Sequence, residues 1–259
     1  MILTHKGAKI NYNTSGKGKT IVFLHGFIES AAMWEETMNR LSHKYHCIAI
    51  DLLGHGKTEC IGYIHTMEDM AHAVKSVLDH LKVTSGVFVG HSMGGYVALA
   101  CIDLFPTIVS GLVMLNSTSY PDSAEKKQNR KRAITLVKSN PNSYTSMVIS
   151  FLFAEKHRKQ YALEINTIKD QASKTSLQGI IAALEGVSVR KDRGMILAHY
   201  KGPKVFFVGD KDPILSYDHF QKETKQYGID MITFNGGHMT YLENKEEYIQ
   251  NLIRFLSLC

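Results

Sequence analysis

The 259-residue sequence contains no apolar run long enough to cross a lipid bilayer. The apolar stretch from Ser146 to Ala154 is too short for that role, so we expect it to form a buried face of the protein. The opening residues, MILTHKG, lack the basic and apolar segments of a secretory signal peptide. We therefore expect a cytoplasmic protein that does not enter a membrane.

Cysteines are few, and the motifs that bind metals or nucleotides are missing. The four cysteines show no close pairing, which favours reduced thiols over disulfides. His43 and His46 have the spacing of metal ligands, but no third or fourth ligand accompanies them. The glycines of the segment GHSMGG, at residues 90–95, are not followed by the Lys-Ser or Lys-Thr of a phosphate-binding loop. We expect neither a metal nor another cofactor.

Positive charge is in excess, with a net charge of +6 and a sequence pI of about 9.0. Part of the excess comes from one basic segment, which contains Lys126, Lys127, Arg130, Lys131, Arg132 and Lys138. Such a segment either attracts anionic substrates, acidic lipids or nucleic acid, or forms the solvated face of a helix. No nucleic-acid motif accompanies it, so we favour the solvated face. We expect a small-molecule substrate as the partner and no nucleic acid; the sequence leaves the oligomeric state open.

The most informative motif is GHSMGG at residues 90–95, because it directly follows the apolar, strand-like residues 87–89. A strand that runs into G-x-S-x-G and then into a helix is typical of a nucleophile elbow. The turn at the serine is so sharp that bulky neighbours would clash, which explains the glycines two residues before and after it. The turn also puts Ser92 at a helix N-terminus, where free amides favour developing negative charge. We predict that Ser92 is a nucleophile.

An aspartate and a histidine follow this serine, each just after a strand-like segment. The apolar residues 205–208 lead into GDKDP at residues 209–213, and residues 229–234 lead into NGGH at residues 235–238. Parallel strands bring their carboxyl ends to one edge of a sheet, so these distant residues can converge there. We predict a catalytic triad in which His238 is the base and an aspartate orients it.

These motifs, together with LHGF at residues 24–27 and DLLGHG at residues 51–56, resemble the α/β-hydrolase-fold proteins that carry a cap. That group includes esterases, C–C bond hydrolases and cofactor-free haloperoxidase-like enzymes. The resemblance spans most of the chain but finds nothing diagnostic between about residues 120 and 190. It implies that the backbone amides of Phe27 and Met93 form an oxyanion hole. It also suggests that His25 braces this loop and that residues 51–56 form a structural turn.

Two aspartates compete for the acid position of the triad. Family spacing places the acid three residues after Gly209, which selects Asp212 and leaves Asp210 as the alternative. Some relatives carry the acid after the preceding strand instead. Here residues 112–115 lead to Asn116 and Ser117, which offer no carboxylate, and this supports Asp212.

The resemblance predicts an α/β fold with a mostly parallel central sheet flanked by helices. Because the predicted triad draws on both ends of the chain, residues 1–119 and 187–259 would form one core. Residues 120–186 would form a helical cap inserted after the sixth strand, with helices over residues 143–154, 156–172 and 176–184 from their apolar spacing. The side chains that we expect to line the pocket are Phe27, Trp34, Met93, Phe151 and Phe153. Core packing is the alternative role for the last two.

The leading functional hypothesis is a serine hydrolase that cleaves a small or medium carboxylic ester through an acyl-enzyme on Ser92. A C–C bond hydrolase or a menaquinone-type lyase would use the same triad on anionic substrates. Tyr96 stands where the menaquinone relatives typically carry arginine, which disfavours that reading. A third hypothesis is a ligand-binding signalling protein on a hydrolase scaffold, since such proteins can keep the triad.

Overall fold

The computed structural model describes residues 1–259 and contains one eight-stranded sheet in the order β1-β2-β4-β3-β5-β6-β7-β8. β2 is antiparallel to both β1 and β4, and the remaining pairs are parallel. The strands are β1 (Ile2–His5), β2 (Ala8–Ser15), β3 (Thr20–Leu24), β4 (His46–Ile50), β5 (Gly86–His91), β6 (Val109–Leu115), β7 (Lys204–Gly209) and β8 (Asp230–Phe234). The predicted mostly parallel α/β sheet is confirmed.

The central strands are apolar at nearly every position because helices cover both faces of the sheet. Side chains alternate between the faces: Val22 and Phe88 belong to one hydrophobic core, and Phe23 and Val89 to the other. The two cores contain 36 and 34 buried residues, so both faces are packed to a similar extent. Both faces of the sheet are therefore covered, which leaves the ends of the strands as the place for functional groups.

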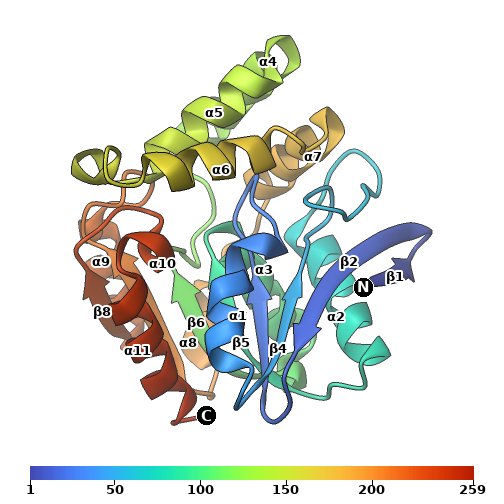
Figure 1. Ribbon diagram of the computed structural model, residues 1–259, viewed down its shortest axis with the longest axis vertical. Helices are drawn as coiled ribbons and strands as arrows, with labels where there is room; N and C mark the ends of the chain where they lie inside the picture. The colour runs from blue at the N-terminus through green and yellow to red at the C-terminus, as the bar shows by residue number, and fades with distance from the viewer.

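Figure 1 shows the helices that flank the sheet. Residues of α2, α3, α8 and α9 join the first core, and residues of α1 and α11 join the second. The helices of this part of the chain are α1 (Glu35–Leu41), α2 (Met67–His80), α3 (Met93–Leu104), α8 (Gly194–His199), α9 (Tyr217–Tyr227), α10 (Thr240–Glu243) and α11 (Lys245–Leu256). The same part of the chain contains two 3₁₀ turns, η1 (Ala31–Trp34) and η2 (Pro106–Ile108). None of the helices combines the length and the apolar character needed to span a bilayer.

A helical insertion between β6 and β7 lies beyond the carboxyl ends of the parallel strands (Figure 1). Its elements are α4 (Ala124–Ser139), α5 (Pro141–Leu152), the 3₁₀ turn η3 (Glu155–His157), α6 (Ala162–Ala172) and α7 (Leu177–Ser188). α4 packs against α5 and α7, and α5 packs against α6. The insertion therefore covers the sheet edge at which the chain carries GHSMGG.

The sequence predicts three helices here with errors at their ends. Asn140 caps α5 by accepting a hydrogen bond from the Ser143 amide at 3.0 Å, so this helix begins before the expected start. The predicted helix over residues 156–172 is wrong in its first part, because η3 and a turn precede α6. α7 continues past residue 184 to Ser188, beyond the expected boundary of the insertion at residue 186.

The turn from β5 into α3 brings backbone segments so close that only glycine fits beside the serine. A Cβ atom on Gly94 would overlap the carbonyl oxygens of Leu24 and His25, which belong to β3 and the loop after it. A Cβ atom on Gly90 would lie 2.6 Å from backbone atoms of Gly94. Both glycines therefore serve the close approach of α3 to the sheet.

We expect Gly94→Ala to lower the free energy of unfolding by about 3 kcal/mol, because β3 would have to move away from α3. Urea unfolding measures the change. Gly62→Ala is the matched control: it lies on an exposed loop with open space at its Cβ and a φ of +71°, so it should cost only about 1 kcal/mol. Equal losses in the two variants would contradict the steric argument.

Candidate active site

Ser92 stands at the turn between β5 and α3 in a conformation that serine rarely adopts. Its φ is 49° and its ψ is −113°. The strain is held by hydrogen bonds from the Ser92 amide to the Leu115 carbonyl at 2.9 Å and from the Ser117 hydroxyl to the Ser92 carbonyl at 2.7 Å. Strained residues of this kind collect at functional sites because the surrounding fold must hold them in place.

His238 and Asp212 lie together at the carboxyl edge of the sheet, on the loops after β8 and β7. The Nδ1 atom of His238 is 2.7 Å from Oδ2 of Asp212, and both residues are buried. The side-chain amide of Asn116 also donates to Oδ2 at 2.9 Å, and the backbone amides of Ile214 and Leu215 donate to Oδ1. The carboxylate is thus fixed in position, and it fixes the imidazole.

The pKa of Asp212 reflects these contacts. Burial by itself raises the pKa, but the charge and hydrogen bond of His238, with the hydrogen bonds of Asn116 and Leu215, hold the pKa below its ordinary value. Asp212 is therefore ionised at neutral pH and can stabilise a positive charge on His238. Asp210, the alternative acid, forms an ion pair with Lys211 at 3.1 Å instead.

Ser92 and His238 line one pocket of about 440 Å³ below α4 and α5. No direct hydrogen bond joins the Ser92 hydroxyl to His238, as is common in enzymes without substrate. Ten of the 16 lining residues are hydrophobic, so the walls suit an apolar group beside the polar centre. The predicted lining residues Phe27, Met93 and Phe151 are among them.

Two expected lining residues lie elsewhere. Trp34 is fully buried and packs against Phe23 and Tyr241, with ring centroids 5.2 and 5.8 Å away. Phe153 is also fully buried, with its ring 6.0 Å from that of Tyr161. Both side chains belong to the core that contains α1 and α11, and neither lines the pocket, so the prediction that they line it is wrong.

The backbone expected to hold an oxyanion borders the same pocket. Met93 is the first residue of α3, so its amide has no acceptor within the helix. Phe27 lies on the loop after β3, and the next residue, Ile28, has a φ of +55°. The interpretation of His25 as a brace is confirmed, because its ring bonds to the Gly26 carbonyl at 2.7 Å and accepts from the Leu52 amide at 2.9 Å.

A buried pair that the sequence analysis missed, Glu29 and His91, lines this pocket. The His91 Nδ1 atom is 2.7 Å from Oε2 of Glu29, which also accepts from the Gly26 amide at 2.7 Å. On its other side, the His91 ring donates to the His238 carbonyl at 2.9 Å. His91 is the variable second residue of G-x-S-x-G, and its position in the motif was the only available signal.

The pKa values of this pair move in opposite directions. Burial favours the neutral form of each group, but their mutual charge and hydrogen bond outweigh it. The pKa of Glu29 is therefore lowered and that of His91 raised. Glu29 and His91 form a charged pair at this pocket at slightly acid pH.

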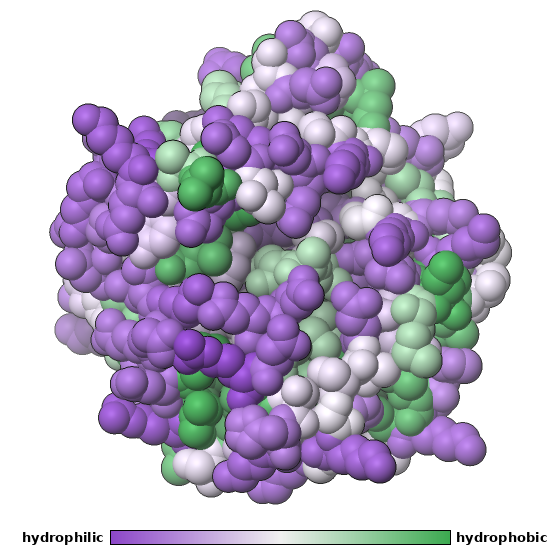
Figure 2. All heavy atoms as spheres, in the orientation of Figure 1, coloured by the Kyte–Doolittle hydropathy of each residue, from purple (hydrophilic) through white to green (hydrophobic).

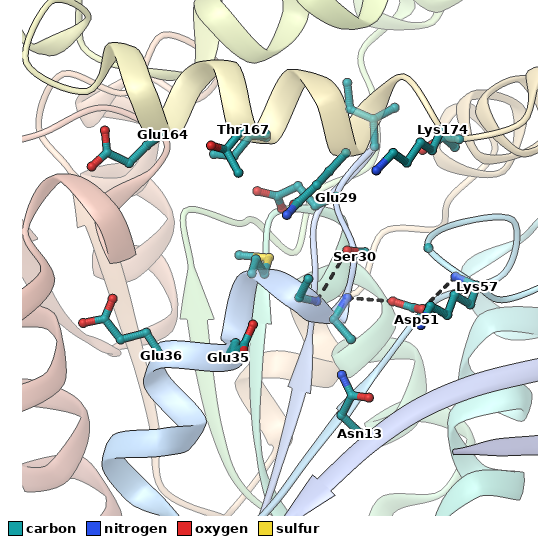
Figure 3. A pocket seen from close by; sticks show the side chains of 18 of the residues that line it. Asn13, Glu29, Ser30, Glu35, Glu36, Asp51, Lys57, Glu164, Thr167 and Lys174 are labelled. Carbon is teal, nitrogen blue, oxygen red and sulfur yellow. Dashed lines mark hydrogen bonds between the residues drawn. The ribbon is translucent and has the colours of Figure 1, made fainter.

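A larger cavity of about 780 Å³ opens on the other side of Glu29, between α6 and the segment of η1 and α1. Figure 2 shows this face of the molecule hollowed below α6. Figure 3 shows Glu164 and Lys174 above the cavity and Glu35 and Asp51 below it, with Asp51 bonded to neighbouring backbone amides. Neither Ser92 nor His238 lines it, and no group of three or more His, Cys, Asp or Glu side chains in the chain has the arrangement of a metal site.

Comparisons with known proteins find relatives that share the fold of this chain. A family model described as alpha/beta hydrolase fold matches residues 19–245. A thermophilic esterase from Thermogutta terrifontis has 26% identical residues and a TM-score of 0.91, with 99% of this chain and 96% of that chain covered. The AB hydrolase superfamily protein YisY from Bacillus subtilis is 29% identical over 92% of this chain and 91% of its own length.

Shorter matches reach higher identity. The uncharacterized hydrolase YugF from Bacillus subtilis is 37% identical over 42% of this chain and 40% of its own length. The matched part of the chain spans less than half the length of two curated relatives, YugF included.

We expect Glu29→Gln to lower the free energy of unfolding by about 3 kcal/mol near pH 5.5, because it leaves His91 without its charged partner. A raised His91 pKa contributes stability below the unfolded-state value of about 6.5, and this contribution is lost as the pH rises through the folded-state value. The difference from the unaltered protein should therefore shrink by pH 8.5. Urea unfolding at the two pH values measures it.

The matched control is Glu36→Gln, which removes an exposed carboxylate paired with Lys245. It should change stability by less than about 1 kcal/mol at either pH. A loss in Glu29→Gln that is the same at pH 5.5 and pH 8.5 would show that the charge of His91 does not contribute.

Proposed function

Because the chain belongs to the alpha/beta hydrolase fold family, we propose that it is a serine hydrolase that cleaves small or medium carboxylic esters. The observation that carries the proposal is that Ser92 and His238 line one pocket, with His238 bonded to the buried Asp212. A serine at a helix N-terminus, beside an imidazole that a carboxylate orients, matches the needs of acyl transfer.

In the proposed reaction, the Ser92 hydroxyl attacks the ester carbonyl while the free Nε2 atom of His238 accepts its proton. Asp212 keeps Nδ1 protonated and stabilises the imidazolium as it forms. The negative oxygen of the tetrahedral intermediate accepts hydrogen bonds from the amides of Phe27 and Met93. Each such donor contributes about 3–4 kcal/mol to the stability of the transition state.

The intermediate then collapses, and the imidazolium of His238 donates its proton to the leaving alcohol. The acyl group remains on Ser92. A water molecule, activated by the neutral His238, attacks the acyl-enzyme and releases the acid. No step of the proposed reaction uses a cofactor.

The pocket supports an ester of limited size. Its volume of about 440 Å³ and its apolar walls suit a short or medium hydrocarbon group. Met147 and Phe151 of α5 line it while about half exposed, so they border the opening. The helical insertion acts as a cap that keeps bulk water from the acyl-enzyme. The named activity of the Thermogutta terrifontis esterase points to the same class of substrate.

We expect Ser92→Ala to reduce kcat for p-nitrophenyl esters by at least about a thousandfold, because no other serine or threonine lines the pocket. The measurement uses chain lengths from acetate to decanoate, with thermal unfolding to verify the fold. Ser150→Ala on α5 is the control, since its hydroxyl bonds only to the Ser146 carbonyl at 3.0 Å and does not line the pocket. Undiminished turnover by Ser92→Ala would exclude this nucleophile.

Substitutions of two neighbouring aspartates test which of them is the acid of the triad. We expect Asp212→Asn to lower kcat about ten-thousandfold, because an amide leaves His238 in the wrong tautomer and without a stabilising charge. Asp210→Asn should stay within about twofold of the unaltered enzyme, because its carboxylate pairs with Lys211. Ester hydrolysis from pH 6 to pH 9 compares them. The opposite ranking would assign the acid to Asp210.

A further inference from the structure

Apart from His91, which is paired with Glu29, the catalytic pocket contains one cationic side chain that the proposed ester hydrolysis does not use. Arg130 of α4 lines the pocket together with Ser92 and His238, among mostly apolar neighbours. Its side chain is 25% exposed, so the guanidinium is partly desolvated and still reachable. Among the residues of the basic segment, Arg130 alone lines this pocket, whereas Lys127, Lys131, Arg132 and Lys138 are exposed.

The guanidinium of Arg130 is held in place by Asp122. Its Nε and Nη2 atoms both donate to the Asp122 carboxylate, which is itself fully buried. No hydrogen bond within the chain uses Nη1 of Arg130. The arginine is thus oriented by two contacts and keeps one nitrogen for a ligand, as a preorganised binding group should.

Asp122 does not need Arg130 for its neutralisation. Arg190, which is almost fully buried, donates from Nη1 to Oδ1 of Asp122 at 2.6 Å and also lies over the Tyr96 ring at 4.3 Å. Two guanidinium groups therefore share one carboxylate. The cluster of Asp122, Arg130 and Arg190 carries a net charge of +1 beside the pocket.

Neither of the other two carboxylates near the pocket bonds to Arg130. Glu29 is paired with His91 at 2.7 Å, and Asp212 is held by His238 at 2.7 Å and by the side-chain amide of Asn116 at 2.9 Å. Lys126, one turn before Arg130, adds positive charge. Burial lowers the pKa of Lys126 and the guanidiniums of Arg190 and Arg130 lower it further, whereas Asp122 opposes them. The guanidiniums of Arg130 and Arg190 thus outnumber the one carboxylate that pairs with them.

We propose that Arg130 forms an anion subsite of the catalytic pocket and selects a substrate that carries a carboxylate in addition to the ester group. This inference rests on the proposed serine hydrolase and specifies its substrate class. The excess of one positive charge matches a monoanion better than a phosphate dianion. The apolar walls between the polar centre and Arg130 suit a hydrocarbon link between the ester and the carboxylate.

Matched ester pairs test the subsite, each pair differing in one carboxylate. Mono-p-nitrophenyl adipate and p-nitrophenyl heptanoate differ on the acyl side, and 4-(hexanoyloxy)butanoate and pentyl hexanoate differ on the alcohol side. We expect that in one of the two pairs the charged ester has a higher kcat/KM than its neutral partner. Arg130→Gln should reduce the preference about tenfold to a hundredfold, the value of one charge-assisted hydrogen bond. Arg130→Lys should restore part of it because it keeps the charge.

Arg132→Gln on the same helix is the control, since its exposed side chain bonds only to Asn129 at 3.3 Å. It should leave both preferences unchanged. Equal turnover of charged and neutral esters in both pairs, unaltered by Arg130→Gln, would overturn the subsite and leave the serine hydrolase standing. The preference is a ratio within one variant, so a partly destabilised Arg130→Gln protein still reports it.

A binding measurement separates failure of the subsite from failure of the proposed function. Calorimetry with monomethyl adipate on Ser92→Ala, and on that variant combined with Arg130→Gln, needs no turnover. Tighter binding that depends on Arg130, with no ester turned over by the unaltered protein, would retain the anion subsite and reject ester hydrolysis. Binding that is equal in the two proteins would overturn the subsite whatever the turnover.

Discussion

The hydrogen-bonded pair of Glu29 and His91 joins three of the segments around the pocket that Ser92 and His238 line. Glu29 holds the amide of Gly26 in the loop after β3, and His91 ends β5 and bonds to the carbonyl of His238. The hydroxyl of Tyr241 approaches the second oxygen of Glu29 at 3.4 Å. Because these segments are far apart in sequence, the parallel sheet must bring them to one edge before the pair can form. The hydrogen bonds of the pair then hold the three segments in fixed positions relative to one another.

The sequence was sufficient to predict the site where a single residue meets a local requirement of steric fit or spacing. Gly90 and Gly94 stand where any Cβ would overlap the backbone, so the elbow could be predicted from six residues. Asp212 could be selected by its spacing from Gly209, and it bonds to His238. The sequence was insufficient where packing decides: Trp34 and Phe153 are as apolar as pocket walls, and nothing local distinguishes a wall from a core. Contacts between distant polar residues, such as Glu29 with His91, leave no local pattern.

The helical insertion illustrates the same division. Asn140 and Ser176 are caps that fix where α5 and α7 begin, and such caps can be recognised in a sequence. The position of α4 cannot be recognised in the sequence, because its basic residues are compatible with a fully solvated helix. Only the packing of α4 against α5 and α7 turns one face toward the pocket. This is why Arg130 lies at the pocket while Arg132, two residues on, is exposed.

Backbone strain marks the same region of the molecule. Five residues other than glycine have positive φ values, and three of them belong to this region: Ser92 itself, Ile28 next to Phe27, and Asn116, which donates to Asp212. Ile28 is the most costly of these, because a β-branched side chain seldom tolerates this conformation. Each costs about 1–3 kcal/mol, which a fold retains only when surrounding contacts enforce it. Here both hydrophobic cores and the hydrogen bonds of Glu29, His91 and Asp212 supply that enforcement, so the stability of the sheet maintains the geometry of the site.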